Sequence, residues 1–177
     1  MQKGVTLWFT GLPCSGKTVT ANLVAEKLRN MGLKVEQLDG DIVRESLTKD
    51  LGFSKEDRFK NIERVTFVAK LLTRNGVIVT AAFVSPYNEI REMSRREIGE
   101  FILIYVKCSL EECIRRDAKG MYKKAIAGEI KDFTGISDPF EEPKNPEIVI
   151  ETDKMAPEEC TKIIIDKLRD MGYIKNV

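Results

Sequence analysis

Lys17 and Thr18 end an eight-residue stretch whose spacing is suited to holding phosphate groups. The stretch matches G-x-x-x-x-G-K-[ST] and directly follows the apolar run Val5–Thr10. Between an expected strand and an expected helix, this pattern indicates a phosphate-binding P-loop, in which backbone N–H groups and the helix start face the phosphates. We expect Lys17 to contact the β- and γ-phosphates of a nucleoside triphosphate, and the Thr18 hydroxyl to bind Mg²⁺. The nucleotide-binding residues are Gly11, Leu12, Pro13, Cys14, Ser15, Gly16, Lys17 and Thr18.

Two carboxylates, Asp39 and Asp41, form a second candidate group. They lie in the sequence LDGD, after the expected strand Val35–Leu38. Ligands of open α/β sheets bind at the carboxyl ends of the strands, so both side chains are expected beside the phosphates. A carboxylate there can orient the waters of Mg²⁺ or accept the proton of an attacking hydroxyl, which contributes about 10²- to 10⁴-fold in rate.

Arg44, Arg58 and Asn61 are candidates for binding an anionic acceptor. Arg58 and Asn61 are one turn apart near the start of an expected helix, so they share a face. Guanidinium groups hold phosphate or sulfate by two-point contacts, and ordinary solvated charges are the alternative in a chain with 32% charged residues. Phe53 and Phe133 lie outside the periodic core pattern, where a ring either stacks on a flat ligand or packs locally.

Short apolar runs alternate with helical patterns along the chain. The pattern predicts helices from about 16 to 31, from 55 to 74 with Ser54 as cap, after Ser109 in a capping box with Glu112, and from Pro157 to about 171. Repeated strand–helix units indicate a parallel sheet covered by helices on both faces. We therefore predict an α/β, three-layer P-loop NTPase/kinase fold with a sheet of five parallel strands. The expected strands are Val5–Thr10, Val35–Leu38, Val77–Phe83, Phe101–Val106 and Glu147–Thr152.

One segment, residues 116–146, fits neither a strand nor a helix pattern. It is rich in Lys, Gly, Asp and Pro and is too long for an idle connection, so we expect a mobile lid there. No repeat or linker interrupts the rest, and we expect one domain over residues 1–177.

Composition narrows the classes of partner. Basic and acidic residues number 29 and 28, so no overall field favours nucleic acid or an acidic membrane surface. No apolar run approaches the roughly 20 residues of a membrane span, and the N-terminal run is too short for a signal peptide. Four cysteines without paired spacing, and no histidine, give no zinc or disulfide framework. We expect a cytoplasmic protein with reduced thiols.

Three classes of protein share a nucleoside triphosphate site: motor or switch NTPases, small-molecule kinases and nucleotide-sensing regulators. The guanine motif N-K-x-D is absent from the sequence, and Asp117-x-x-Gly120 follows an expected helix instead of a strand. The run Val77–Phe83 also ends without the acid that organises magnesium in motor ATPases. Size and layout favour a kinase. A nucleoside monophosphate kinase and a catalytically silent regulator are the alternatives.

Six motifs, in this order and spacing, resemble the motif set of adenylylsulfate kinases: GLPCSGKT, LDGDIVR, FSKEDRFKNIER, FVSPYNEIR, RDAKGMYKKA and FTGISDPFEEP. The resemblance runs from about Val5 to the last helix. It implies an ATP-dependent phosphotransferase of sulfate assimilation. The implied reaction moves the γ-phosphoryl group of ATP, with Mg²⁺, to the 3'-hydroxyl of adenosine 5'-phosphosulfate (APS) and yields 3'-phosphoadenosine 5'-phosphosulfate and ADP.

The resemblance also implies roles for individual residues. Asp39 and Asp41 would act near the 3'-hydroxyl and the metal, with Thr18 and Asp41 as metal ligands. Arg115 or Arg116 would lie near the ATP base. The implied catalytic residues are Lys17, Asp39, Asp41 and Ser85. In the implied acceptor site, the phosphosulfate is held by Arg44, Arg58 and Asn61. The adenine is clamped by Phe53 and Phe133. The other implied acceptor-site residues are Asp39, Asp41, Phe83, Ser85, Lys119 and Thr134.

Ser85 and Cys14 each allow two interpretations. Ser85 corresponds to a serine described in the family as a phosphoryl carrier, but in-line transfer needs no covalent relay, so we favour a binding or structural role. Cys14 replaces a small loop residue usual in such kinases. A thiol beside a helix N-terminus can be reactive, so we expect Cys14 to be alkylable in the empty enzyme and shielded by nucleotide. The alternative is that Cys14 occurs here only because its side chain is small enough to fit the loop.

Departures from the family pattern limit what the resemblance implies. After LDGD the family commonly continues Asn-Ile-Arg-His, whereas this chain has Ile42, Val43, Arg44 and Glu45. The arginine is kept while its neighbours change, so ligand affinity is expected to differ. Family members are often dimers, and some are joined to an ATP sulfurylase. We expect a homodimer, possible fusion to or association with an ATP sulfurylase, and neither nucleic acid nor membrane as partner.

Overall fold

One parallel sheet runs through the middle of the molecule. The computed structural model describes residues 2–175; residues 1, 176 and 177 of the expected domain lie outside the described part. The five strands have the order β2-β3-β1-β4-β5, and each was expected to within one residue at either end. The predicted fold class is therefore confirmed. The strands are β1 (Val5–Thr10), β2 (Val35–Asp39), β3 (Ile78–Ala82), β4 (Phe101–Lys107) and β5 (Ile148–Glu151).

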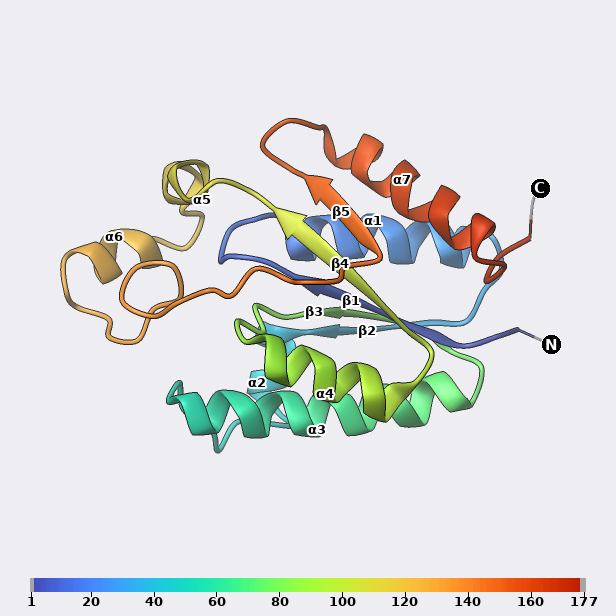
Figure 1. Cartoon of the computed structure of the whole chain (residues 1–177), viewed down its shortest axis with the longest axis horizontal. Coiled ribbons are helices and arrows are strands. Elements are labelled where there is room, and N and C mark those ends of the chain that lie inside the picture. The colour runs from blue at the N-terminus through green and yellow to red at the C-terminus, as the bar shows by residue number, and fades with distance from the viewer. Residues whose placement is uncertain (1, 176–177) are drawn as a thin grey trace.

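Helices cover both faces of the sheet (Figure 1). Helices α1 and α7 pack on each other over one face, and α3 and α4 pack on each other over the opposite face. β1 serves both cores, because Leu7 and Phe9 lie in the core under α1 and α7 while Trp8 lies in the core under α3 and α4. The helices are α1 (Lys17–Asn30), α2 (Gly40–Glu45), α3 (Lys55–Arg74), α4 (Asn88–Ile98), α5 (Leu110–Arg116), α6 (Met121–Ile126) and α7 (Pro157–Asp170).

The carboxyl ends of all five strands meet at one end of the sheet because every pairing is parallel. Figure 1 shows α5, α6 and the loops around them at this same end. The P-loop follows β1 here, and α2 follows β2. The fold thus gathers the candidate residues from distant parts of the sequence at one edge.

Three helices, α2, α4 and α6, were not expected from the sequence. Helix α4 turns Ile90, Met93 and Ile98 toward the core, but it also buries Arg91 and Ser94, and these few apolar positions among mostly charged residues were overlooked in the sequence. Helices α2 and α6 have six residues each, too few for a periodic pattern to emerge. Helix α6 lies inside the expected lid, where Asp117 accepts hydrogen bonds from the N–H groups of Tyr122 and Lys123 at 2.9 and 3.0 Å.

The caps of two expected helices can be compared with the structure. Ser54 caps α3, since its side chain accepts from the N–H of Asp57 at 3.1 Å. The capping box at Ser109 is only half formed. Ser109 Oγ accepts from Glu112 N at 3.4 Å, but the Glu112 carboxylate binds arginines of its own helix, and Ser109 N donates to Asp153 Oδ2 at 3.0 Å.

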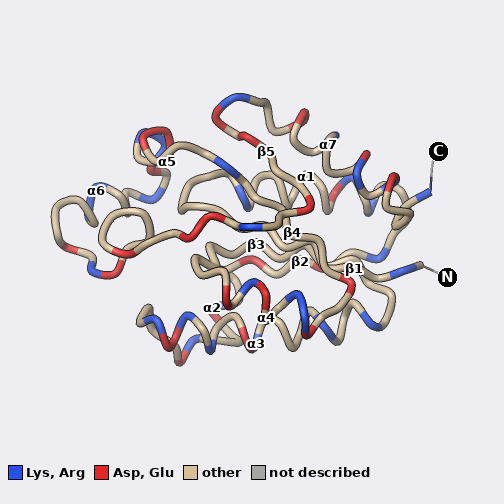
Figure 2. Tube along the Cα trace, in the orientation of Figure 1, with Lys and Arg blue, Asp and Glu red and all other residues tan. Residues whose placement is uncertain are grey.

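Charge is distributed evenly over the helical layers. Figure 2 shows basic and acidic residues interspersed along α3 and α4, in keeping with a net charge of +1. None of the helices in residues 2–175 combines the length and the hydrophobicity that a membrane crossing requires.

Candidate active site

The P-loop depends on two glycines. A Cβ on Gly11 would lie 2.4 Å from the carbonyl oxygen of Val106, so only glycine fits against β4. Gly16, with φ of 98°, takes the left-handed conformation from which α1 starts. Between them, the hydroxyl of Ser15 is buried and has no hydrogen-bond partner among the described residues. An unpaired donor beside a helix N-terminus is suited to an anionic ligand.

Lys17 provides the positive charge of the P-loop. Its ammonium donates to the carbonyl oxygens of Gly11 and Leu12 at 3.0 and 2.7 Å. Burial disfavours the charged form and lowers the pKa of Lys17 to about 8. A bound phosphate would restore the charged form, so this lysine is well placed to bind a nucleotide.

Thr18 connects the P-loop helix to the two carboxylates. Thr18 Oγ1 donates to Asp39 Oδ2 at 2.7 Å, and the other oxygen of Asp39 accepts from the backbone N–H of Asp41 at 3.0 Å. Asp39 is therefore engaged through both oxygens as the N-cap of α2. The structure brings together the three residues that the sequence suggested for metal binding and base chemistry.

Lys119 joins the lid to this group. Its ammonium forms an ion pair with Asp41 Oδ2, and both side chains are largely exposed, at 64% and 71%. The hydrogen bond to Asp41 raises the pKa of Lys119, so the lysine stays charged. The start of α6 thus faces α2 across the carboxyl end of the sheet.

Arg44 lies over the ring of Phe53, 4.2 Å from its centroid. Its Nη1 donates to the carbonyl oxygens of Leu51 and Gly52 at 3.2 and 3.1 Å. Burial, and then the neighbouring Arg58, lower the pKa of Arg44. The Nε and Nη2 groups have no recorded acceptor in residues 2–175 and are available to an anion.

Arg58 is occupied by protein groups. Its Nε donates to Phe53 O at 2.9 Å, Nη1 donates to Thr134 Oγ1 and Asp138 Oδ2, both at 2.8 Å, and Nη2 donates to Asp132 O. One guanidinium therefore ties the lid to the loop that carries Phe53. The sequence did not indicate these lid contacts.

The other expected acceptor residues differ in how they are placed. Asn61 is 6% exposed and its Oδ1 has no partner in the described residues, so it can accept from a ligand. Phe53 is 63% exposed, whereas the ring of Phe133 packs edge-on against Tyr122 at 5.0 Å. The ring of Phe83 is 4% exposed and stacks on Trp8, so its side chain belongs to the core and only its backbone could contact a ligand.

Ser85 is a buried structural residue in this geometry. It is 3% exposed, and its Oγ accepts from Trp8 Nε1 at 3.0 Å and donates toward Thr10 Oγ1 at 3.1 Å. Its backbone has φ of 38°, an uncommon value for a residue with a side chain. A hydroxyl with these partners is poorly placed to carry a phosphoryl group, in line with the interpretation favoured from the sequence.

The two arginines proposed for the ATP base are placed differently. Arg116 reaches the P-loop, where it donates to Cys14 O at 3.4 Å and to Thr152 O at 2.7 Å. Arg115 is exposed and pairs with Glu112 at 2.6 Å. Of the pair, Arg116 therefore lies beside the nucleotide loop. Cys14 is partly exposed while the other three cysteines are buried, and its reactivity stays a prediction.

Sequence reasoning missed several residues that shape the site. Thr152 Oγ1 donates to Ser15 O at 2.5 Å and braces the P-loop. Arg91, 1% exposed, donates to Ser85 O and Glu141 O, both at 2.5 Å, and so fixes the loop before α4 to the far end of the lid. Arg91, Asp138 and Glu141 lie in motifs that the sequence marked, but an arginine in a motif carries no signal that it is buried, and Thr152 lies at the end of an expected strand.

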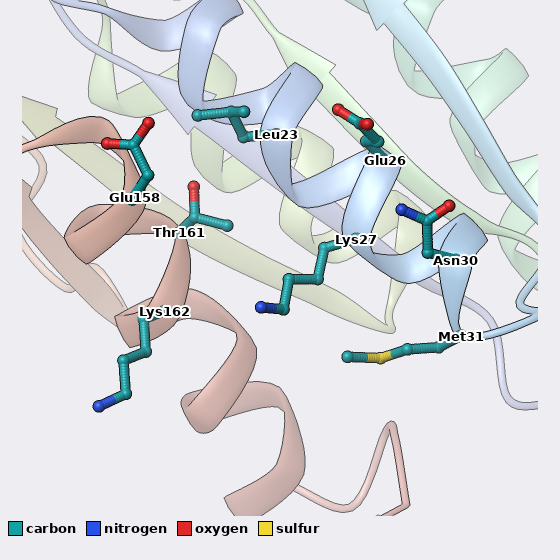
Figure 3. A pocket seen from close by; sticks show the side chains of 8 residues that line it. All are labelled: Leu23, Glu26, Lys27, Asn30, Met31, Glu158, Thr161 and Lys162. Atoms are coloured by element: carbon teal, nitrogen blue, oxygen red, sulfur yellow. The ribbon is translucent and has the colours of Figure 1, made fainter.

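Two hollows lie outside this group. A groove of about 390 Å³ between α1 and α7 is lined by neutral and charged side chains, including Leu23, Lys27 and Glu158 (Figure 3). A cavity of about 880 Å³ between the ends of β4 and β5 and the lid is lined by Leu12, Tyr105 and Asp138 among others. Neither is lined by Lys17, Asp39 or Asp41, so the site is defined by the P-loop and by the hydrogen bonds that join Thr18, Asp39 and Asp41.

Comparisons with known proteins agree on one family. The family model described as adenylylsulphate kinase matches residues 3–151. An adenylyl-sulfate kinase of Picosynechococcus is 57% identical over 172 residues, which cover 97% of either chain. The structure of a Mycobacterium tuberculosis APS kinase in complex with AMPPNP and APS is 41% identical, with a TM-score of 0.92, over 96% of this chain and 99% of that one. A hexameric APS kinase of Thiobacillus denitrificans is 32% identical with a TM-score of 0.76, and the match covers 99% of this chain but 31% of that longer one.

Proposed function

The chain belongs to the adenylylsulphate kinase family, and we propose that it transfers the γ-phosphoryl group of ATP to the 3'-hydroxyl of APS through the residues described above. The products are 3'-phosphoadenosine 5'-phosphosulfate and ADP. The observation that carries this mechanism is the hydrogen bond of 2.7 Å between Thr18 and Asp39, which joins the nucleotide loop to the carboxylates.

The nucleotide binds along the P-loop. The N–H groups that follow Gly11 and the unpaired hydroxyl of Ser15 face the phosphates, and Lys17 exchanges its carbonyl partners for phosphate oxygens. Arg116 lies over the side of the loop and contacts the ATP base.

The donor set at this site fits Mg²⁺. Thr18 would hold the ion, with Asp41 acting on it through its waters, and the described residues contain no cluster of three or more acidic, cysteine or histidine side chains that would favour a protein-caged metal. Magnesium usually keeps several waters and binds through few protein oxygens and the phosphates. When bound, it neutralises charge on the transferred phosphoryl group.

Asp41 is the general base in this proposal. Both oxygens of Asp39 are engaged, whereas Asp41 is exposed and has one oxygen paired with Lys119. The remaining oxygen accepts the proton of the 3'-hydroxyl as the phosphoryl group is transferred. Lys119 pairs with the other oxygen and holds the carboxylate in position near the acceptor.

The acceptor binds between the loop of Phe53 and the lid. Arg44 offers the free side of its guanidinium to the phosphosulfate, and Asn61 supplies a buried amide. The exposed ring of Phe53 and the ring of Phe133 contact the adenine. Backbone groups of Phe83 and Ser85, with Thr134 of the lid, complete the pocket.

Assembly and location are part of the proposal. The hexameric relative supports a self-associating kinase, and we keep the homodimer as the expected state. The chain of the hexameric relative is longer than this one, which is compatible with an APS kinase that forms part of a larger chain, such as a fusion to a sulfurylase. A cytoplasmic location, with neither nucleic acid nor membrane as partner, rests on composition.

The test is an assay of the purified chain with Mg-ATP and either APS or AMP. Phosphorylation of APS with little turnover of AMP supports the proposal. Turnover of AMP instead would assign a nucleoside monophosphate kinase, and nucleotide binding without transfer would assign a silent regulator.

A further inference from the structure

The carboxylate of Asp138 lies on the acceptor side of the site. Its Oδ2 accepts from Arg58 Nη1 at 2.8 Å and from the hydroxyl of Tyr87 at 3.0 Å. The Arg58 and Asp138 side chains are 13% and 21% exposed, so this ion pair is partly shielded from water. A negative charge is therefore held where the anionic group of an acceptor has to approach.

The position of Asp138 matters because most hydrogen-bond donors of Arg58 are already used by the protein. A guanidinium has five N–H groups, and four of those on Arg58 are used by Phe53, Asp132, Thr134 and Asp138. Of these acceptors, only Asp138 contributes a charged group. A phosphosulfate that binds Arg58 by two contacts must share or displace at least one of these four acceptors, and Asp138 is the one whose negative charge opposes the anion.

Asp138 also closes its own loop. Gly135 N donates to Asp138 O at 2.8 Å, and Thr134 and Asp138 form an isolated bridge. Its carboxylate is thus fixed in position by a turn of the lid and aimed at α3 and at the loop before α4. The Arg58–Asp138 ion pair therefore joins α3 to a turn of the lid.

We propose that Asp138 competes with the acceptor's phosphosulfate for Arg58 and thereby weakens acceptor binding. The inference rests on the proposed function, because it takes the anion near Arg58 to be that of the acceptor. The same competition helps the product, which retains the phosphosulfate, to leave.

The variant Asp138→Asn tests this inference. Asparagine keeps an oxygen that can accept from Tyr87 and Arg58, so the change removes the charge and preserves the contact geometry. Calorimetric titration with APS in the presence of ADP is expected to show a dissociation constant lowered roughly two- to five-fold. The gain should shrink as salt is added, since the pair is only partly shielded.

A matched control is Glu129→Gln, which removes one negative charge from an exposed position of the lid. It should leave the dissociation constant unchanged. Asp138→Ser removes the charge with a smaller side chain and should also tighten binding, so a folding defect in one variant does not decide the matter. In an Arg58→Gln background the gain from Asp138→Asn should vanish, because Asp138 acts through Arg58.

Unchanged or weaker APS binding in both folded Asp138 variants would overturn the inference while leaving the proposed function intact. A gain that persists in the Arg58→Gln background would also overturn it. If the wild-type chain binds AMP and not APS, the proposed function fails, and the same comparison with AMP decides whether Asp138 competes for Arg58.

Discussion

Lys119 and Asp41 form an ion pair although they lie 78 positions apart in the sequence. The contact closes the lid onto α2, directly beside the P-loop. Because Asp41 N donates to Asp39, which binds Thr18, one chain of contacts runs from the nucleotide helix to the lid. The residues that face the nucleotide and those that face the acceptor therefore hold each other in position.

Lys119→Gln should lower kcat/KM for APS by roughly 10-fold, because the site loses a cation facing the acceptor and Asp41 loses its partner. Nucleotide affinity should change little, since Lys119 does not contact the P-loop. Steady-state kinetics and nucleotide titration check both parts. Lys123→Gln, at an exposed position of α6, is the control and should behave as wild type. Equal kcat/KM in the two variants would contradict the assigned role.

Nucleotide affinity should fall as the pH rises above about 8. In the free protein the pKa of Lys17 is lowered to about 8 by burial, so the lysine loses its proton between about pH 7 and pH 9. Bound phosphates favour the charged form, and binding then takes up a proton. The dissociation constant for ATP should rise about ten-fold at about pH 9. Calorimetry in buffers of different ionisation enthalpy measures the proton uptake; in Lys17→Met, binding should be weak and lose this dependence. A constant affinity across the range would disprove the coupling.

Ser85→Ala should retain kcat within a few-fold while the protein becomes less stable. The change leaves the buried Trp8 N–H without its acceptor, which costs about 1–3 kcal/mol of unfolding free energy. Urea denaturation and steady-state kinetics measure the two effects. A folded variant with kcat lowered by several orders of magnitude, together with phosphoserine at this position in the wild-type protein, would establish a covalent relay instead.

Arg91→Met should lower the free energy of unfolding by about 2–4 kcal/mol, because the carbonyl groups of Ser85 and Glu141 lose a buried donor. Burial lowers the pKa of Arg91 to about 10, so the guanidinium remains charged at neutral pH. Chemical denaturation provides the measurement. Arg96→Met, at an exposed position of the same helix, should be nearly neutral. Similar losses in both variants would mean that the buried contacts do not stabilise the fold.

Much of the fold was predictable because its signals are local. Strands buried on both faces read as apolar runs, and the long helices α1, α3 and α7 show periodic apolar positions. Helix α4 was missed because its apolar positions are few among charged residues, and the burial of its Arg91 depends on carbonyl groups of the adjoining loop and of the distant lid, at Ser85 and Glu141. Glu112 pairs with arginines of α5, and so completes no capping box, although the sequence spacing fits one.

Those parts of the site that consist of short sequence motifs could be predicted. The P-loop, Asp39 and Asp41 follow from spacing and from the end of the sheet at which ligands bind. The contacts of Arg58 with Asp138 and Thr134 span 80 and 76 positions and depend on how the lid folds, which no local pattern encodes. For Phe83, the motif gave the position, and the core packing of its ring was visible only in the structure.

The most direct test of the account is to identify the phosphorylated product formed from Mg-ATP and APS by the wild-type chain and by Asp41→Asn. We expect phosphate on the 3'-oxygen of APS, and near loss of this product in the variant while nucleotide binding is retained. A phosphate on any other oxygen, or full turnover by folded Asp41→Asn, would contradict the assignment of Asp41 as the base at this site.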